Sequence, residues 1–377
     1  MKKKAKLLVA VILIVLISLI VLYSIKDFSA AINSEETVKI GALLALTGDA
    51  AFYGSDELKA IQIAVDEKNK EGGINGRKIE LIVEDIGTLD TPLAISALRK
   101  LVDFDNVKVI IGPTWDMPGV ALAAEEEKVV LISPDNTEGT EVGNDLKYFY
   151  STWAPQRAEA AAMTKFIIQR DYEDIIIFRD SDIYAKTVTD IFTDTAKNSV
   201  NIIDTHVVLT GEKDFRTDLI KIKEKQPDAI FLTFASETLV GPFLKQVKEL
   251  GLEVDVLGTV GAENGLSGHT DYAEVTLFYT YPKITKEQLD LLEKFELKYD
   301  VEPQVPAYAN AYDAANIVIT ALNSGASNPD EIRNYFDNNK FKSVTFGTLK
   351  FDEKGYVSVD SVDYIIKTVK DGKFIEL

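Results

Sequence analysis

Polar and aromatic side chains follow most of the strands that the sequence predicts, and they suit ligand binding. In an open parallel sheet, ligands bind beyond the carboxyl ends of the strands. The relevant loops come after Leu46, Ile111, Ile132, Phe178, Thr233 and Leu257. We therefore take these side chains as the candidate ligand-binding residues: Tyr53, Trp115, Asp116, Asp135, Asn136, Thr137, Tyr184, Ser236 and Glu263.

Residue sets typical of catalysis do not occur in the sequence. The phosphate-binding glycine motifs are absent, as is the Gly-x-Ser-x-Gly elbow of serine hydrolases. The chain has no cysteine, which excludes disulfides, thiolate metal sites and a cysteine nucleophile. Its two histidines, His206 and His269, have no plausible nucleophile beside them. We expect a binding protein rather than an enzyme, with no metal site and no cofactor.

The N-terminus predicts a membrane segment. Residues 7–23 form an apolar run broken only by Ser18, with four lysines before it. This run is long for a signal-peptide core and slightly short for a spanning helix, which needs roughly 20 residues. The lysines place the N-terminus in the cytoplasm and the rest of the chain outside. We interpret residues 1–36 as a signal anchor or a signal peptide plus linker, and favour the uncleaved anchor over cleavage near Ser29-Ala30-Ala31.

Two α/β units are predicted for the remaining sequence, which is long enough for two domains. In the first, buried strands at 38–46, 78–84, 107–111 and 129–132 alternate with helices. That alternation predicts a parallel sheet covered on both faces. The pattern restarts at a helix over residues 155–169 and continues to a strand near 275–279.

The C-terminal part departs from this alternation. Three predicted helices, over residues 286–299, 308–323 and 329–338, follow one another without intervening strands. A β-rich tail comes next, and Asp371-Gly372 is a hairpin signal within it. We infer that the chain returns to cover the first unit and then crosses back to the second.

Several short motifs, in order, resemble the leucine/isoleucine/valine-binding proteins, which are ABC-transporter substrate-binding proteins of the type 1 periplasmic-binding family. The motifs are Leu46-Thr47-Gly48, Tyr53-Gly54, Gly72-Gly73-Ile74-Asn75-Gly76-Arg77, Ile111-Gly112-Pro113, Ile132-Ser133-Pro134, Ala311-Tyr312-Asp313-Ala314 and Phe351-Asp352-Glu353-Lys354-Gly355. The resemblance implies an α/β fold of two Rossmann-like lobes with parallel central sheets, joined by a three-strand hinge, with the ligand cleft between them. A single hydrophobic helix precedes the lobes.

Lobe boundaries follow from the same resemblance. Residues 37–152 and 283–343 would form lobe 1, and residues 153–282 and 344–377 would form lobe 2. The three crossings would then fall near Trp153, Pro282 and Val344.

The function implied is that of an extracytoplasmic solute-binding protein of an ABC importer. Such a protein captures an amino acid or a related small amide or carboxylate by hinge closure and delivers it to a permease. The alternative is a receptor domain that presents its ligand to a signalling partner. A net charge of −19 argues against nucleic acid as a partner. The expected partners are thus a small ligand, a permease and, through the N-terminal helix, the membrane.

Site roles are also implied by the resemblance. Thr137 matches a threonine that binds a ligand carboxylate, while residues 114–118 replace the loop that carries a partner serine. Tyr53 and Tyr184 match aromatic residues that line the cleft. Val260 occupies the place of the acid that binds an ammonium group, so Glu263 or Asp116 would have to substitute for it. An α-amino acid, an amide and a small carboxylate all remain open as ligands.

Overall fold

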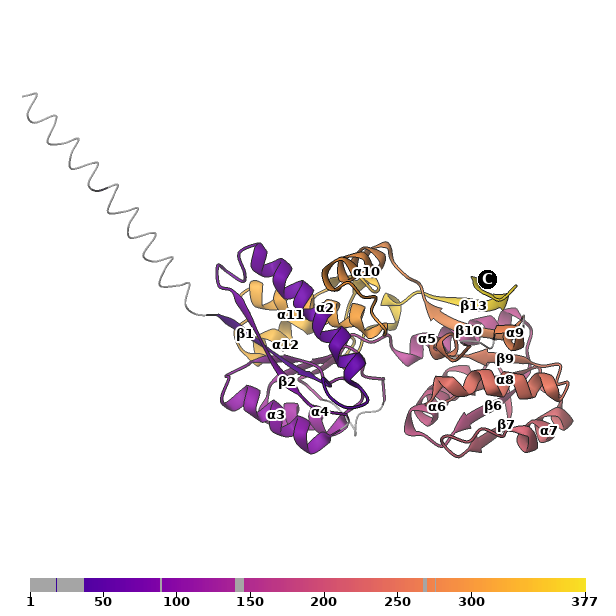
Figure 1. Ribbon diagram of the computed structural model, residues 1–377. Coiled ribbons are helices and arrows are strands. Elements are labelled where there is room, and N and C mark those ends of the chain that lie inside the picture. The colour runs from indigo at the N-terminus through magenta and orange to yellow at the C-terminus, as the bar shows by residue number, and fades with distance from the viewer. Residues whose placement is uncertain (1–17, 19–36, 89, 140–145, 267–269, 275) are drawn as a thin grey trace, which may run out of the picture.

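The computed structural model describes residues 18, 37–88, 90–139, 146–266, 270–274 and 276–377. Within them the chain forms two lobes side by side (Figure 1). The membrane segment expected over residues 7–23 lies outside the described residues, apart from Ser18. No helix in the described part of the chain is long and apolar enough to span a bilayer.

The first lobe is built on a parallel sheet with the strand order β2-β1-β3-β4-β5. The central strands β3 and β4 are short, fully buried apolar runs because both faces of the sheet are covered there. Leu98 and Val120 pack beneath one face, and Ile61 and Ala311 cover the other. The elements of this half are β1 (Val38–Leu44), α2 (Ala51–Lys70), β2 (Ile79–Asp85), α3 (Thr91–Asp103), β3 (Val109–Ile111), α4 (Pro118–Glu127), β4 (Val130–Ser133) and β5 (Phe149–Ser151).

Three helices return to this lobe, as the sequence indicates. Phe295, Ala311 and Phe336, one from each helix, are buried in the same core cluster as Ile40 of β1. The returning elements are α10 (Lys286–Tyr299), α11 (Ala307–Asn323), α12 (Pro329–Asn338), β11 (Phe341–Ser343) and β12 (Gly347–Leu349). Figure 1 shows α11 and α12 close to α2, and α10 on the side of the first lobe that faces the second lobe.

The second lobe has a seven-stranded sheet with the order β14-β13-β10-β9-β8-β6-β7. The predicted hairpin is confirmed, since Lys370 pairs with Lys373 across Asp371 and Gly372, both at positive φ. The elements are α5 (Gln156–Gln169), β6 (Asp174–Asp180), α6 (Ile183–Ala196), β7 (Asn201–Val208), α7 (Arg216–Lys225), β8 (Ala229–Thr233), η1 (Glu237–Leu239), α8 (Val240–Glu249), β9 (Asp255–Gly258), η2 (Val260–Ala262), η3 (Asn264–Leu266), α9 (Thr270–Ala273), β10 (Leu277–Pro282), η4 (Val359–Ser361), β13 (Tyr364–Lys370) and β14 (Lys373–Glu376).

Three segments connect the lobes. The first joins β5 to α5 and the second joins β10 to α10. The third comes later than the crossing expected near Val344, because Leu349 and Val357 are buried in the core of the first lobe. The reason is a contact with a returning helix: the backbone N–H groups of Val344 and Thr345 donate to the buried carboxylate of Asp313 on α11. The chain therefore leaves the first lobe after Val357 and enters β13.

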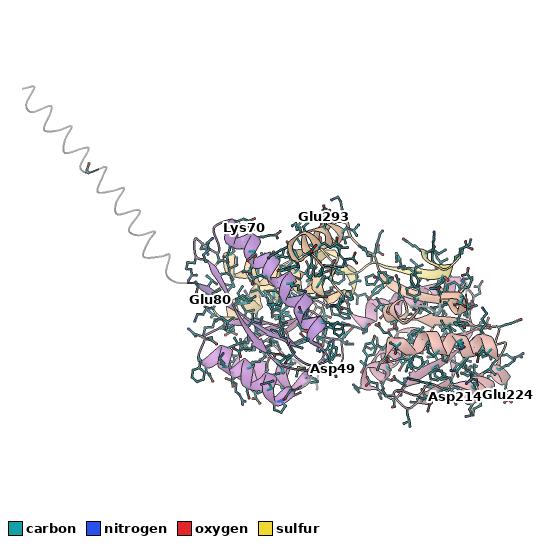
Figure 2. The ribbon with its side chains drawn as sticks, viewed as in Figure 1. Asp49, Lys70, Glu80, Asp214, Glu224 and Glu293 are labelled. Carbon is teal, nitrogen blue, oxygen red and sulfur yellow. The ribbon has the colours of Figure 1, made fainter. Side chains whose placement is uncertain are left out.

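Acidic side chains cover the outside of both lobes, in keeping with the net charge. Figure 2 shows Glu80 and Glu293 on the first lobe and Asp214 and Glu224 on the second; all four are exposed. An acidic surface of this kind keeps the molecule soluble and repels nucleic acid.

Candidate ligand-binding site

Two loops at the carboxyl ends of β3 and β4 are held together by their own carboxylates. The backbone N–H of Trp115 donates to Oδ1 of Asp135 at 2.8 Å, and that of Thr137 donates to Oδ1 of Asp116 at 2.6 Å. Trp115 takes a left-handed backbone conformation, with φ at 65°. Each loop thus places an acidic side chain on a backbone donor of the other loop.

A third carboxyl group lies beneath this pair of loops. Glu57 of α2 is fully buried, and the Thr114 hydroxyl donates to its Oε2. Burial, followed by the nearby negative charge of Asp135, raises the pKa of Glu57 well above its usual range. Burial also raises the pKa of Asp135 to about 7, although the Trp115 N–H opposes this. Oε1 of Glu57 and Oδ2 of Asp135 accept from no other group of the described residues, but a side-chain hydrogen bond between the two acids contributes to the pKa of each.

Aromatic rings from α2 and the β3 loop adjoin these acids. The rings of Tyr53 and Trp115 meet edge to face with centroids 5.3 Å apart. Burial raises the pKa of the Tyr53 hydroxyl, and the charges of Glu237, Asp135 and Glu57 raise it further. Glu237 belongs to the second lobe, so Tyr53 lies within electrostatic reach of both lobes.

From the second lobe, Tyr184 faces the same region. Its backbone N–H donates to Asp182, which caps α6. Burial raises the pKa of the Tyr184 hydroxyl, with added contributions from Glu159, Glu237 and Asp116. Because Asp116 comes from the first lobe, the candidate residues of the two lobes face one another. We call Tyr53, Trp115, Asp116, Asp135, Tyr184 and Glu237 the interlobe site.

Glu237 is positioned by a glycine. An ideal Cβ built on Gly261 would lie 2.4 Å from Oε1 of Glu237, closer than real contacts allow. The glycine therefore leaves the space that the Glu237 side chain occupies. Gly261 follows β9, in the segment where the family resemblance places an acid at Val260.

A buried acid from another part of the fold lies beside Val260. The carboxylate of Glu159, on α5, accepts hydrogen bonds from the backbone N–H of Val260 at 2.8 Å and from the Thr280 hydroxyl at 2.6 Å. Glu159 is buried, and burial raises its pKa. A carboxyl group thus lies next to Val260 although the residue there is apolar.

Some expected site residues have other partners. Glu263 pairs with Lys367 and accepts a hydrogen bond from the Tyr279 hydroxyl at 2.7 Å, within the second lobe. The Glu263 carboxylate is therefore occupied by partners within the second lobe, away from Asp116 and Asp135 of the first lobe. The Asn136 side chain is buried, and its backbone carbonyl accepts from the Ser151 hydroxyl at 2.9 Å. Ser236 is exposed, with its hydroxyl 2.7 Å from that of Thr238.

Three acids, Glu57, Glu159 and Glu237, were not among the predicted site residues. A signal for two of them exists in the sequence. Glu57 lies on the apolar stripe of α2, four residues before Ile61, and Glu159 lies four residues before Met163 on α5. A carboxylate at a core position of a helix is costly unless it has a partner, so such a residue marks a functional site. Glu237 gives no such signal.

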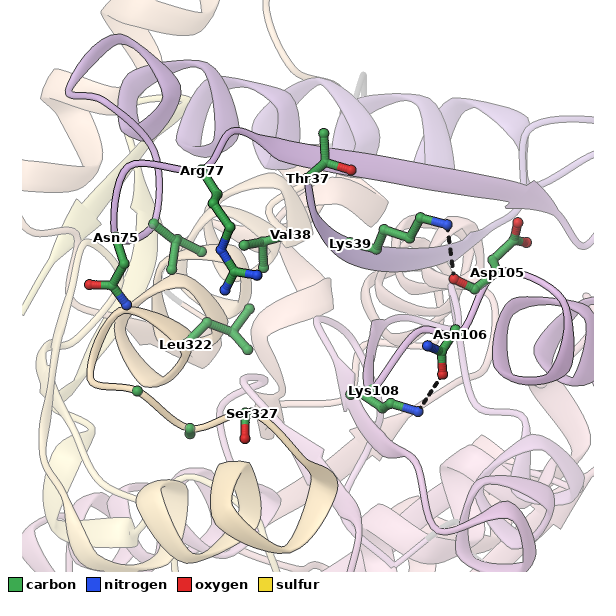
Figure 3. A pocket seen from close by; sticks show the side chains of 13 residues that line it. Thr37, Val38, Lys39, Asn75, Arg77, Asp105, Asn106, Lys108, Leu322 and Ser327 are labelled. Atoms are coloured by element: carbon green, nitrogen blue, oxygen red, sulfur yellow. Dashed lines mark hydrogen bonds between the residues drawn. The ribbon is translucent and has the colours of Figure 1, made fainter. Parts of the chain in front are cut away.

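A cavity of about 590 Å³ lies elsewhere, at the amino end of β1. Figure 3 shows Lys39, Arg77 and Lys108 around it, with Lys39 bonded to Asp105 and Lys108 to Asn106. This cavity is at the wrong end of the sheet for the loops that follow the strands. No group of acidic or histidine side chains in the described residues is arranged to hold a metal ion.

Comparison with known proteins agrees with this architecture. The sequence profile of the periplasmic binding protein family matches residues 37–366, and the chain belongs to that family. Within it, the chain groups with the Leu/Ile/Val-binding proteins.

Two similar proteins and one solved structure illustrate the relationship. The leucine-, isoleucine-, valine-, threonine- and alanine-binding protein of Pseudomonas aeruginosa is 24% identical, with 88% of this chain and 90% of that protein covered. Leu/Ile/Val-binding protein homolog 3 of Brucella melitensis is 26% identical, over 90% and 93% of the two chains. The isoleucine complex of LivJ from Streptococcus pneumoniae superimposes with a TM-score of 0.71 at 25% identity, over 91% and 100% of the chains.

Proposed function

We propose that this protein is the extracytoplasmic solute-binding component of an ABC importer. It captures a small solute of amino-acid size between its lobes, and hinge closure presents the closed form to a permease. The observation that carries the proposal is that each lobe places a charge within reach of a tyrosine of the other: beyond the effect of burial, Glu237 raises the pKa of Tyr53, and Asp116 raises that of Tyr184. A ligand held by both halves stabilises the closed arrangement, because only that arrangement makes both sets of contacts.

Similarity to proteins named for amino-acid binding supports the solute class. The three connecting segments support the hinge, since two of them are joined where the Lys283 N–H donates to the Asp363 carbonyl at 2.9 Å. The apolar run over residues 7–23 supports a tether to the outer face of the membrane. Blotting of membrane and soluble fractions for the full-length chain tests that tether, and recovery of only a shortened soluble form contradicts it.

Thermal unfolding of the full-length protein in mild detergent tests the binding function. Amino acids, amides, amines and small carboxylates are screened after dialysis that removes carried-over ligand, with nucleobases as an unrelated class. A true ligand at about 100 times its Kd stabilises the native state by about 2.7 kcal/mol, which raises Tm visibly. If no small solute of any class raises Tm, the importer proposal is wrong.

A further inference from the structure

We propose that the solute bound at the interlobe site is an organic cation that lacks a carboxylate, such as an alkylamine, a diamine or a guanidinium compound. This inference rests on the proposed function, because it names the class of ligand for that same site. It differs from binding of an ordinary amino acid, which carries both charges.

The first reason is that backbone donors suited to an anion are already used. In a solute site at strand ends, free N–H groups hold a ligand's carboxylate. Here the N–H of Trp115 donates to Asp135 and the N–H of Thr137 donates to Asp116. A carboxylate of the ligand would have to displace a carboxylate of the protein, and it would meet the repulsion of the other.

The second reason is that two buried carboxyl groups, those of Asp135 and Glu57, have no cation paired with them in the part of the chain that the structure describes. Asp135 is 8% exposed and Glu57 is 0% exposed, and a hydrogen bond between the two side chains contributes to the pKa of each, so the pair shares a proton. None of the ion pairs formed by the described residues includes either acid. A buried carboxyl pair without a cation of its own favours a ligand that brings N–H donors and positive charge.

The third reason is the character of the remaining walls. Tyr53 and Trp115 place two aromatic rings beside the acids, and Tyr184 belongs to the same site from the second lobe; aromatic rings attract cations. Arg157, at the start of α5, does not offset the acids, because its guanidinium is held by Glu138 and by Asp352, the latter at 2.6 Å. The site therefore combines acids and rings, which is the composition that recognises an ammonium or guanidinium group.

Four probes with one carbon skeleton test the charge requirement directly. Leucine carries both charges, isopentylamine lacks the carboxylate, 4-methylpentanoate lacks the ammonium, and leucinamide replaces the carboxylate with a neutral amide. Putrescine and agmatine extend the series to other cations. Calorimetric titration of the full-length protein should give at least about tenfold tighter binding of one or more of the cations than of leucine or 4-methylpentanoate.

The outcomes separate this proposal from the proposed function. Binding of leucine or 4-methylpentanoate as tight as that of the cations overturns the cation proposal and leaves solute capture intact. If none of the cations binds, the cation proposal is also wrong. The wider solute screen then tests the importer function separately. Binding restricted to the cations, and weakened by added salt, supports it.

Charge-neutral variants supply a second readout. In the double variant Asp116→Asn/Asp135→Asn, the cations should lose at least about tenfold in affinity, while 4-methylpentanoate should lose none. Asp103→Asn, an exposed acid at the end of α3, is the matched control and should bind like the wild type. Cations that bind the double variant as tightly as the wild type would contradict the proposal, provided that circular dichroism shows the variant folded.

Discussion

Asp116 and Thr137 are joined by a hydrogen bond of 2.6 Å from the backbone N–H of Thr137 to Oδ1 of Asp116. The bond connects the loop after β3 to the loop after β4, which lie 21 residues apart in sequence. It fixes the position of a negative charge at the end of the first sheet, where a ligand of this fold is expected.

Removing this carboxylate should expose the Thr137 amide. In Asp116→Ala we expect hydrogen exchange at Thr137 to accelerate by at least about tenfold, because local opening no longer breaks a charge-assisted bond. Exchange at Trp115 should change little, since that amide donates to Asp135 instead. Exchange measured by NMR or mass spectrometry checks both amides, and equal acceleration at the two would show that the loops act as one unit.

Burial of Asp135 predicts a pH dependence of stability. Its folded pKa is about 7, against about 3.9 in an unfolded chain. Between these values the folded state holds a proton that the unfolded state has lost, so stability falls as pH rises from about 4 to 7. Glu57 shifts in the same direction and adds to the fall.

Asp135→Asn should reduce that slope, because the amide does not titrate. We expect the wild type to lose at least about 1.4 kcal/mol more than the variant between pH 4 and pH 8, the equivalent of one pKa unit. Denaturant unfolding at the two pH values gives the measurement, with Asp103→Asn as the charge-matched control. If the free energy of unfolding depends on pH in the same way in the wild type and in Asp135→Asn, burial does not raise the pKa of Asp135.

Gly261 should control the position of Glu237. In Gly261→Ala, the new methyl group would lie 2.4 Å from Oε1 of Glu237, and the flexible end of that side chain must move. We expect a loss of ligand affinity of about tenfold with a stability change within about 1 kcal/mol. Gly119→Ala is the control, since its methyl group would meet the Thr91 side chain at 2.8 Å, on the outer face of the first lobe. Calorimetric titration of both variants against the best solute compares them.

Arg157 should hold the first connecting segment. Glu138 is buried beside it, and Asp352 accepts from its guanidinium. Arg157→Ala leaves the Glu138 carboxylate without its cation, so we expect a loss of about 1–3 kcal/mol in the free energy of unfolding. Arg99→Ala breaks the exposed pairs with Glu126 and Glu127 and should stay within about 0.5 kcal/mol. A loss for Arg157→Ala no larger than that for Arg99→Ala would contradict the role of the ion pair at the hinge.

Local patterns determined much of the architecture. Continuous apolar runs such as residues 107–111 and 129–132 specify strands buried on both faces, and alternation with helices makes the sheet parallel. Three helices in succession, without strands, indicated the return to the first lobe. The third crossing was misplaced because the hydrogen bonds from Val344 and Thr345 to Asp313 are contacts between residues about 30 positions apart.

For the candidate site too, some features follow from the sequence and others depend on the tertiary structure. The order of strands and helices in the sequence placed Trp115, Asp116 and Asp135 in loops that follow strands, and the family resemblance pointed to Tyr53 and Tyr184. Whether an acid is free for a ligand depends on which partner the fold brings to it. Sequence alone therefore suggested candidate side chains for the site, but it missed three of the acids there. Only the tertiary structure decided that Glu263 is held by Lys367, while Glu237 and Glu159 supply the acids near Tyr184, because such pairings join segments distant along the chain.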